Sequence, residues 1–259
     1  MALDLIADKN LLIHSINDFS QKYHIDFFIT INLAENYLRH INEPSALALA
    51  ENFERTLCAW GAGRRKAPKV KSYSEITSAL LDIRVIESIK LFSGTRMTDF
   101  KITGSTVEIA DTASSIENIK KRLFDSLRLF SNEFFIGNTS ITYPMKSLLL
   151  LTGFMPAWDS QVRKGLSLAG FSGTNAHFLL PDKHDSTAFQ KISSLPFYLG
   201  DCYTKNKNTF DTAIRESNYP ELISDPGRLF DILFFMQGSK QQCILSCSGV
   251  SRGWYRIFN

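Results

Sequence analysis

An amine and a carboxylate that suit covalent chemistry lie close together in the stretch 137–170, GNTSITYPMKSLLLLTGFMPAWDSQVRKGLSLAG. Lys146 stands near the start of one predicted helix, and Asp159 stands at the start of the next. A helix N-terminus favours a carboxylate through its free amides and its dipole, and it disfavours the charged form of a lysine. A lysine with a lowered pKa is a nucleophile. Two interpretations stay open: a catalytic pair in one cleft, or a surface lysine and an N-cap aspartate.

Two short helices must position these groups. Pro144 is typical of a first helical turn and Gly153 of a helix end, which predicts a helix over 144–152. Asp159 predicts the cap of a second helix, which Gly170 ends. Because the turn between the two helices is short, we expect their N-termini to face a common region.

A basic loop precedes this stretch in the chain. Residues 61–71, GAGRRKAPKVK, carry five positive charges and no acid, and they lie between two predicted helices. Such a loop attracts phosphate groups, and each phosphate that it neutralises releases counterions. The alternative is a solvated surface loop that aids solubility. We take Arg64, Arg65, Lys66, Lys69 and Lys71 as candidate DNA-binding residues, together with Arg163 and Lys164 in the second helix.

The remaining pattern is mainly helical and predicts an all-α protein of about ten helices. Capping boxes at Ser72 and Ser114, each with Glu three residues later, predict helices over 75–92 and 116–130. A helix starts at Pro44, and further helices are expected over 185–195, 206–217 and 226–237. Strand candidates are short, at 107–110 and 241–248. The chain is expected to form one domain, and the alternative is two lobes with a boundary near 95–112.

Composition excludes several classes of protein. The formal net charge is +3, the hydrophobic fraction is 44%, and no run of residues approaches the length of a membrane span. The N-terminus lacks the basic region of a signal peptide, so a cytoplasmic protein is expected. The four cysteines show no zinc-like spacing, and we expect reduced, mostly buried thiols and no metal. Phosphate-loop, dinucleotide, serine-hydrolase and zinc-protease motifs are absent, and no cofactor is expected.

The segment PAWDSQVRKGL, residues 156–166, resembles the segment after the helix-hairpin-helix motif in DNA glycosylases of the endonuclease III and 8-oxoguanine glycosylase superfamily. Asp159 matches the catalytic carboxylate of that family, while Gln161 replaces its histidine. The longer stretch TYPMKSLLLLTGFMPAWDSQVRK (142–164), with AWGAGRRK (59–66) and GRLFDILFFM (227–236), also resembles a group of uncharacterised bacterial all-helical proteins. The residues before Lys146 depart from the glycosylase pattern, because 137–145 offers only one glycine where the family has a G-x-G hairpin.

The resemblance implies an enzyme that flips a damaged or modified DNA base into a pocket between helical lobes and cleaves its N-glycosidic bond. Asp159 would stabilise the positive sugar, and Lys146 would add a Schiff base and strand cleavage. Trp158, Tyr143, Phe154 and Trp60 are candidates for the base pocket, with ordinary core aromatics as the alternative.

Two other functions fit the same sequence. One is a non-catalytic helical nucleic-acid-binding protein in which Asp159 is only a cap. The other is a bacterial defence or protein-interaction module, which predicts a large exposed apolar patch away from the basic loop. The sequence leaves open which base is bound, whether the strand is DNA or RNA, and the oligomeric state.

Overall fold

The computed structural model describes residues 2–103, 106–109, 112–248 and 253–256, and this part of the chain is mostly α-helical. The all-α expectation is therefore confirmed at this level. The helices are α1 Lys9–Asp18, α2 Gln21–Arg39, α3 Glu43–Ala59, α4 Tyr73–Leu80, α5 Ile83–Ser93, α6 Ile116–Phe134, α7 Thr142–Thr152, α8 Ser160–Leu168, α9 Thr187–Lys205, α10 Lys207–Glu216 and α11 Pro226–Lys240. Short 3-10 turns lie at Met97–Asp99, Pro220–Ser224 and Trp254–Arg256.

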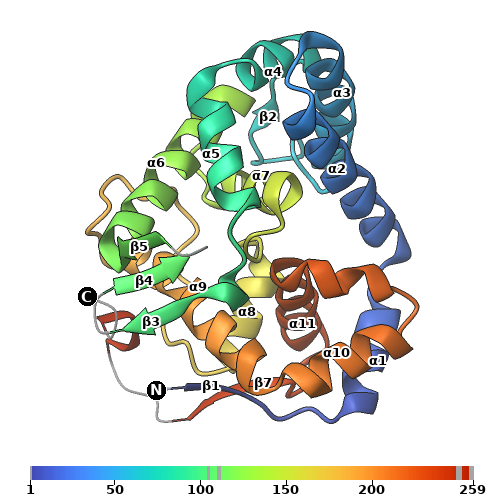
Figure 1. Cartoon of the computed structure of the whole chain (residues 1–259), viewed down its shortest axis with the longest axis vertical. Coiled ribbons are helices and arrows are strands. Elements are labelled where there is room, and N and C mark those ends of the chain that lie inside the picture. The colour runs from blue at the N-terminus through green and yellow to red at the C-terminus, as the bar shows by residue number, and fades with distance from the viewer. Residues whose placement is uncertain (1, 104–105, 110–111, 249–252, 257–259) are drawn as a thin grey trace.

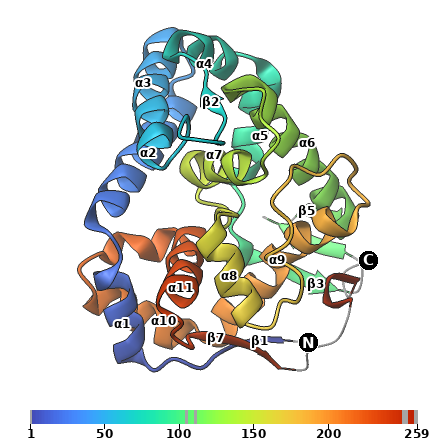
Figure 2. The same cartoon turned by 180° about the vertical axis from the view of Figure 1, so that it is seen from behind.

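The helices gather in two groups along the long axis of the molecule (Figure 1). Helices α3 to α6 lie at one end, and α1 with α8 to α11 lie at the other. Helix α2 runs from the first group toward the second, and α7 lies between them, as the reverse view also shows (Figure 2). The residues expected to do chemistry therefore sit on elements at the middle of the molecule, α7 and the start of α8.

Strands are short and form three small antiparallel sheets. β1 Ala2–Leu5 pairs with β7 Leu245–Ser248, and β3 Lys101–Thr103, β4 Thr106–Ile109 and β5 Thr112–Ser115 form a three-stranded sheet. β2 Lys69–Val70 pairs with β6 Phe135–Ile136. The pairing of β2 with β6 holds the end of the basic loop against the hairpin that leads into α7.

Glycines let α8 and α11 cross at close range. A Cβ atom on Gly165 of α8 would lie 2.0 Å from the carbonyl oxygen of Phe234, and one on Gly238 of α11 would lie 2.0 Å from that of Gln161. Contacts this short are incompatible with any side chain at either position. The two backbones therefore pack directly on each other, and this crossing places the start of α8 beside the polar residues of α11.

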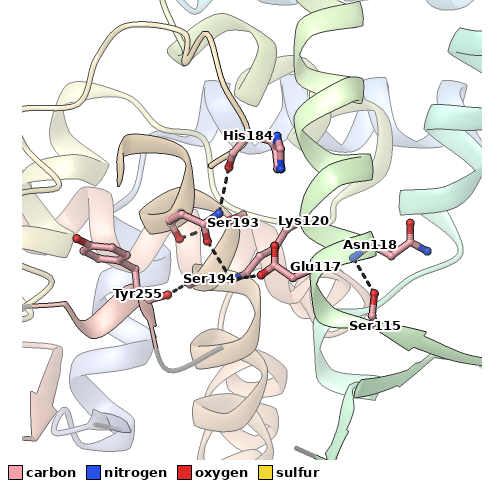
Figure 3. A network of polar contacts seen from close by, with 9 residues as sticks. Ser115, Glu117, Asn118, Lys120, His184, Ser193, Ser194 and Tyr255 are labelled. Atoms are coloured by element: carbon pink, nitrogen blue, oxygen red, sulfur yellow. Dashed lines mark hydrogen bonds and ion pairs between the residues drawn. The ribbon is translucent and has the colours of Figure 1, made fainter. Parts of the chain in front are cut away.

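A buried lysine connects α6 to α9 at the other side of the molecule. Lys120 is 1% exposed, and its Nζ donates 3.1 Å bonds to the side-chain oxygens of Glu117 and Gln190 (Figure 3). The amide of Gln190 in turn donates to the carbonyl of His184. Because the ammonium is paired in this way, the network serves packing between helices.

For the helices that the sequence predicted, most boundaries agree with the structure and three segments differ, while no ranges were predicted for α1 and α2. The segment 75–92 is two helices rather than one, because the Asp82 carboxylate accepts from the Arg84 amide and caps a new start. Helix α6 is capped by Ser115 rather than Ser114. Helix α9 extends to Lys205, ten residues past its expected end, and passes through Pro196.

Two further expectations concern the membrane and the thiols. Over the ranges described, no helix is both long and apolar enough to cross a membrane. Cys202 and Cys247 are buried, whereas Cys58 and Cys243 are exposed. The expectation of mostly buried thiols therefore holds for two of the four. Within the same ranges, no group of three or more His, Cys, Asp or Glu side chains is arranged to hold a metal.

Candidate active site

Lys146 projects from α7 into a buried, polar setting. Its side chain is 8% exposed, and Nζ donates a 2.6 Å hydrogen bond to the carbonyl oxygen of Trp60. Burial lowers the pKa of this amine, while the nearby carboxylates of Asp159 and Asp231 oppose that change. Arg228 acts in the same direction as burial. The result is an amine held in one place and biased toward its neutral, nucleophilic form.

Asp159 caps α8, as the sequence predicts. Its Oδ1 accepts hydrogen bonds from the amides of Gln161 at 2.9 Å and Val162 at 3.0 Å. The residue is only partly buried, and it lines the same cavity as Lys146. Capping and access to a cavity therefore occur together at this residue, and neither excludes the other.

The cavity between these groups has a volume of about 180 Å³. Its walls come from five parts of the fold: the α1–α2 junction, α2, the end of α3, the α7–α8 region and α11. Four aromatic rings line it, beside one amine, one guanidinium and two carboxylates. The lining residues are Phe19, Tyr23, Trp60, Lys146, Ala157, Asp159, Arg228, Asp231 and Phe235. Apolar and aromatic walls around a few charged groups are typical of a small-molecule site.

A buried ion pair on α11 supports this cavity. Arg228 and Asp231, which are 1% and 5% exposed, form a 2.6 Å contact between Nη1 and Oδ2. The other oxygen of Asp231 accepts from the Ala157 amide at 3.0 Å, and Nη2 of Arg228 donates to the carbonyl of Tyr23 at 2.9 Å. The pair thus joins three walls of the cavity. Burial raises the pKa of Asp231 to about 6, against the opposing effect of Arg228.

Aromatic rings surround the guanidinium of Arg228. Its Cζ lies 5.0 Å from the ring centres of Phe19 and Trp60 and 5.1 Å from that of Phe27. Such cation–π contacts stabilise a charge that is removed from water. They also fix the orientation of Phe19 and Trp60, both of which face the cavity.

The four aromatic residues expected in a base pocket occupy different places. Trp60 lines the cavity. Tyr143 donates from its hydroxyl to the Gly61 carbonyl at 3.2 Å and lies beside Lys146, whose Nζ is 5.6 Å from its ring centre. Trp158 and Phe154 are 1% and 3% exposed and belong to the hydrophobic core. Trp158 and Phe154 are therefore ordinary core aromatics, which was the alternative to a base pocket.

The basic loop begins at the cavity. Trp60 and Gly61 accept the bonds from Lys146 and Tyr143, so the loop leaves α3 at the cavity wall. Arg64, Arg65, Lys66 and Lys69 are exposed, and Lys71 is partly exposed. On α8, Lys164 is partly exposed, while Arg163 is tied to the carbonyls of Asp159 and Asn175. The positive loop therefore borders the cavity, and most of its charges face solvent.

The hairpin that leads into α7 uses its amides within the protein. Ser140 donates to the side chain of Asn138, Ile141 to the carbonyl of Phe178, and Thr142 to the hydroxyl of Ser140. A backbone bridge between Ser140 and Leu179 adds to this cover. These three amides are occupied, which agrees with the departure of 137–145 from the G-x-G pattern.

Sequence reasoning missed six of the nine lining residues: Phe19, Tyr23, Ala157, Arg228, Asp231 and Phe235. A signal for two of them was present, since Arg228 and Asp231 are the charged residues in the otherwise apolar run RLFDILFF. Opposite charges three residues apart share a helix face, which is unusual inside an apolar run unless the pair is buried. Nothing in the sequence indicated that Phe19 and Tyr23 approach α11.

Comparison of the chain with protein-family models, curated proteins and solved structures gave no match in any of the three. The geometry of the cavity therefore has to carry the functional argument.

Proposed function

We propose that the protein is a DNA-base glycosylase that flips a damaged or modified base into the cavity at Lys146 and Asp159 and cleaves its N-glycosidic bond. The single observation that carries this proposal is the convergence of that amine and that carboxylate in one aromatic-walled cavity. The hairpin between α6 and α7, followed by the carboxylate at the start of α8, is consistent with a helix-hairpin-helix glycosylase fold.

In this mechanism the flipped base stacks on the aromatic walls. Any of the bases can stack in this way, because stacking needs only a π face. The C1′–N bond breaks and its electron pair leaves with the base, which takes up a proton. Asp159 stabilises the positive charge that develops on the sugar. The neutral amine of Lys146 bonds to C1′ and releases one proton, which balances the proton that the base takes up. The bond from C1′ to the ring oxygen then breaks, its electron pair stays on that oxygen, which takes the second amine proton, and a Schiff base remains between Nζ and C1′.

The basic loop supports a nucleic-acid substrate. Its exposed charges border the cavity and can follow the strand from which the base is flipped. A small anionic substrate would need fewer positive side chains than this loop carries, and it would need them inside the cavity.

One observation favours a second candidate, a nucleic-acid-binding protein without activity. Both hydrogen bonds to Oδ1 of Asp159 come from amides of its own helix, which is what a cap alone requires. Activity of the purified protein separates the two candidates.

The test is an incubation with duplexes that each carry one modified base, scored for abasic sites. We expect release from at least one duplex, and we expect Asp159→Asn to lose it. Asp8→Asn is the matched control, because Asp8 also caps a helix through its carboxylate but lies outside the cavity lining. Equal release by wild type and Asp159→Asn would exclude the assigned role of Asp159.

Borohydride trapping examines Lys146 separately. A covalent protein–DNA adduct is expected with wild type and with Lys90→Gln, an exposed lysine on α5, and none with Lys146→Gln. If the protein released the base without forming an adduct, water rather than Lys146 would be the nucleophile that attacks C1′, and Lys146 would only bind the substrate.

A further inference from the structure

A second cationic site lies at the loop between α8 and α9. Lys191 of α9 is 8% exposed, and its Nζ lies 3.2 Å from Nε2 of His177 and 5.6 Å from the ring centre of Tyr255. Among the ion pairs of the described residues, none joins Lys191 to a carboxylate. Figure 3 shows Tyr255 fixed by a 3.0 Å bond from the hydroxyl of Ser194 to its carbonyl.

An exposed glycine lies against the ammonium of Lys191. Gly173 is exposed, and a Cβ built on it would lie 2.3 Å from Nζ of Lys191. Its φ of +75° also favours glycine at this turn. The ammonium therefore lies directly beneath an exposed position of the chain that carries no side chain.

The ionisable side chains that act on Lys191 and His177 include no carboxylate among the described residues. Burial lowers the pKa of His177, and Lys191 and Arg163 add to that effect. Burial likewise lowers the pKa of Lys191, and the only opposing influence is the Tyr255 hydroxyl. The region around Lys191 and His177 therefore has no carboxylate of the described residues among the groups that shift their pKa values, whereas Asp159 acts on Arg163. An anion is the ligand that such a region favours.

We propose that Lys191 and His177 bind a phosphate group of the nucleic-acid strand whose base enters the cavity. This assignment rests on the proposed function for the identity of the strand. Trp158 links this site to the cavity. Its indole donates to the His177 carbonyl at 2.5 Å, and the next residue in the chain is Asp159. The phosphate is held at Lys191 and His177, which do not belong to the lining of the cavity. Lys191 donates to it, and protonation of His177 exchanges the 3.2 Å bond that its Nε2 accepts from Lys191 for a second donor to the phosphate.

The first test uses inorganic phosphate as the probe and wild-type protein. Binding of an anion favours protonated imidazole, so the pKa of His177 should rise on addition of phosphate, measured by NMR at constant ionic strength. His14, His24, His40 and His184 are internal controls and should move less. An unchanged titration of His177 would overturn the site, and this test requires no variant that has to fold.

The second test measures affinity for a duplex with a tetrahydrofuran abasic analogue at several salt concentrations. Loss of one phosphate contact lowers the salt slope by about 0.9. We expect this change in Lys191→Gln and a smaller one in Lys183→Gln, an exposed lysine of the same loop. Lys191→Arg keeps the charge and should retain most of the slope.

The outcomes separate this site from the proposed function. Base release by wild type with equal slopes in Lys191→Gln and Lys183→Gln would reject the phosphate site and keep the glycosylase. A phosphate-dependent rise in the pKa of His177 without base release from any duplex would keep an anion site and reject the glycosylase.

Discussion

Arg228 and Asp231 form a buried ion pair, with 2.6 Å between Nη1 and Oδ2, at the point where α11 meets both α2 and the turn before α8. Removal of one partner leaves an uncompensated buried charge, which costs about 3–5 kcal/mol. We expect Arg228→Met to reduce the free energy of unfolding by that amount. The double variant Arg228→Met/Asp231→Leu should lose much less than the sum of the two single variants.

Chemical denaturation of all four proteins measures this coupling. The control is the exposed pair of Lys205 and Asp201, which has the same 2.6 Å separation. Its coupling should be below about 1 kcal/mol because both groups stay hydrated. A coupling of that small size for Arg228 and Asp231 would contradict the role assigned to the buried pair.

Asp159 provides the second prediction, which separates capping from chemistry. Asparagine caps a helix about as well as aspartate, whereas alanine costs about 0.5–2 kcal/mol. Asp159→Asn should therefore keep the melting temperature near that of wild type, and Asp159→Ala should lower it. Both variants should lose base release. If activity followed stability across these two variants, Asp159 would be a cap and no more.

Asp225 gives a prediction about pH. This residue precedes α11 beside a second cavity of about 100 Å³, and burial raises its pKa from 3.8 to about 6. Glu35 contributes in the same direction, while Arg96 and Arg228 oppose it. The folded protein therefore keeps the proton to a higher pH than the unfolded chain. Its contribution to stability falls as pH rises from about 4 to about 6, and stays low above that.

Asp225→Asn removes this pH dependence because the amide does not ionise. At pH 7 to 8 the variant should be more stable than wild type by up to ~3 kcal/mol, and near pH 4 the two should be similar. The pKa of His24 is lowered to about 4, which acts in the opposite direction, but it does so in both proteins and cancels in the difference. Denaturant unfolding from pH 4 to 8 measures this difference. A difference independent of pH would show that Asp225 does not titrate as assigned.

Gly165 carries the fourth prediction. Gly165→Ala forces a methyl group against the Phe234 carbonyl and should cost roughly 1–3 kcal/mol or more, since α8 and α11 must separate. Because α8 carries Asp159, base release should fall as well. Gly94→Ala is the matched control: it has a negative φ and its Cβ would lie 3.4 Å from the Lys90 carbonyl, so it should change thermal stability little. Equal melting temperatures for the two variants would contradict the close crossing.

Local signals in the sequence predict local structure well here. Asp159 caps α8 and Gly153 ends α7 in the left-handed conformation, as their residue types indicate. These features depend only on neighbours within one helical turn. The exception is the segment 75–92, where Asp82 competes as a cap inside an otherwise continuous apolar pattern.

The walls of the candidate site were harder to predict because they depend on tertiary contacts. Tyr23 and Arg228 are more than two hundred residues apart, and the hydrogen bond between them follows from how α11 crosses the molecule. Trp158 was expected in the base pocket but lies in the core. Its neighbour Asp159 faces the cavity, and the extended backbone between the two residues turns the indole to the other side. Adjacent residues in extended backbone point to opposite sides.

The basic loop supplies the last prediction. Arg64→Glu with Lys66→Glu should weaken DNA binding and lower its salt dependence, because each lost phosphate contact reduces the slope by about 0.9. Arg65 is left unchanged since its φ of 51° makes the backbone sensitive to substitution. The control is Lys121→Glu with Arg122→Glu. Both residues are exposed on the first half of α6, which does not line the cavity, and the pair changes the net charge by the same amount. Fluorescence anisotropy at several salt concentrations compares the pairs, and equal slopes would show that the loop acts only through net charge.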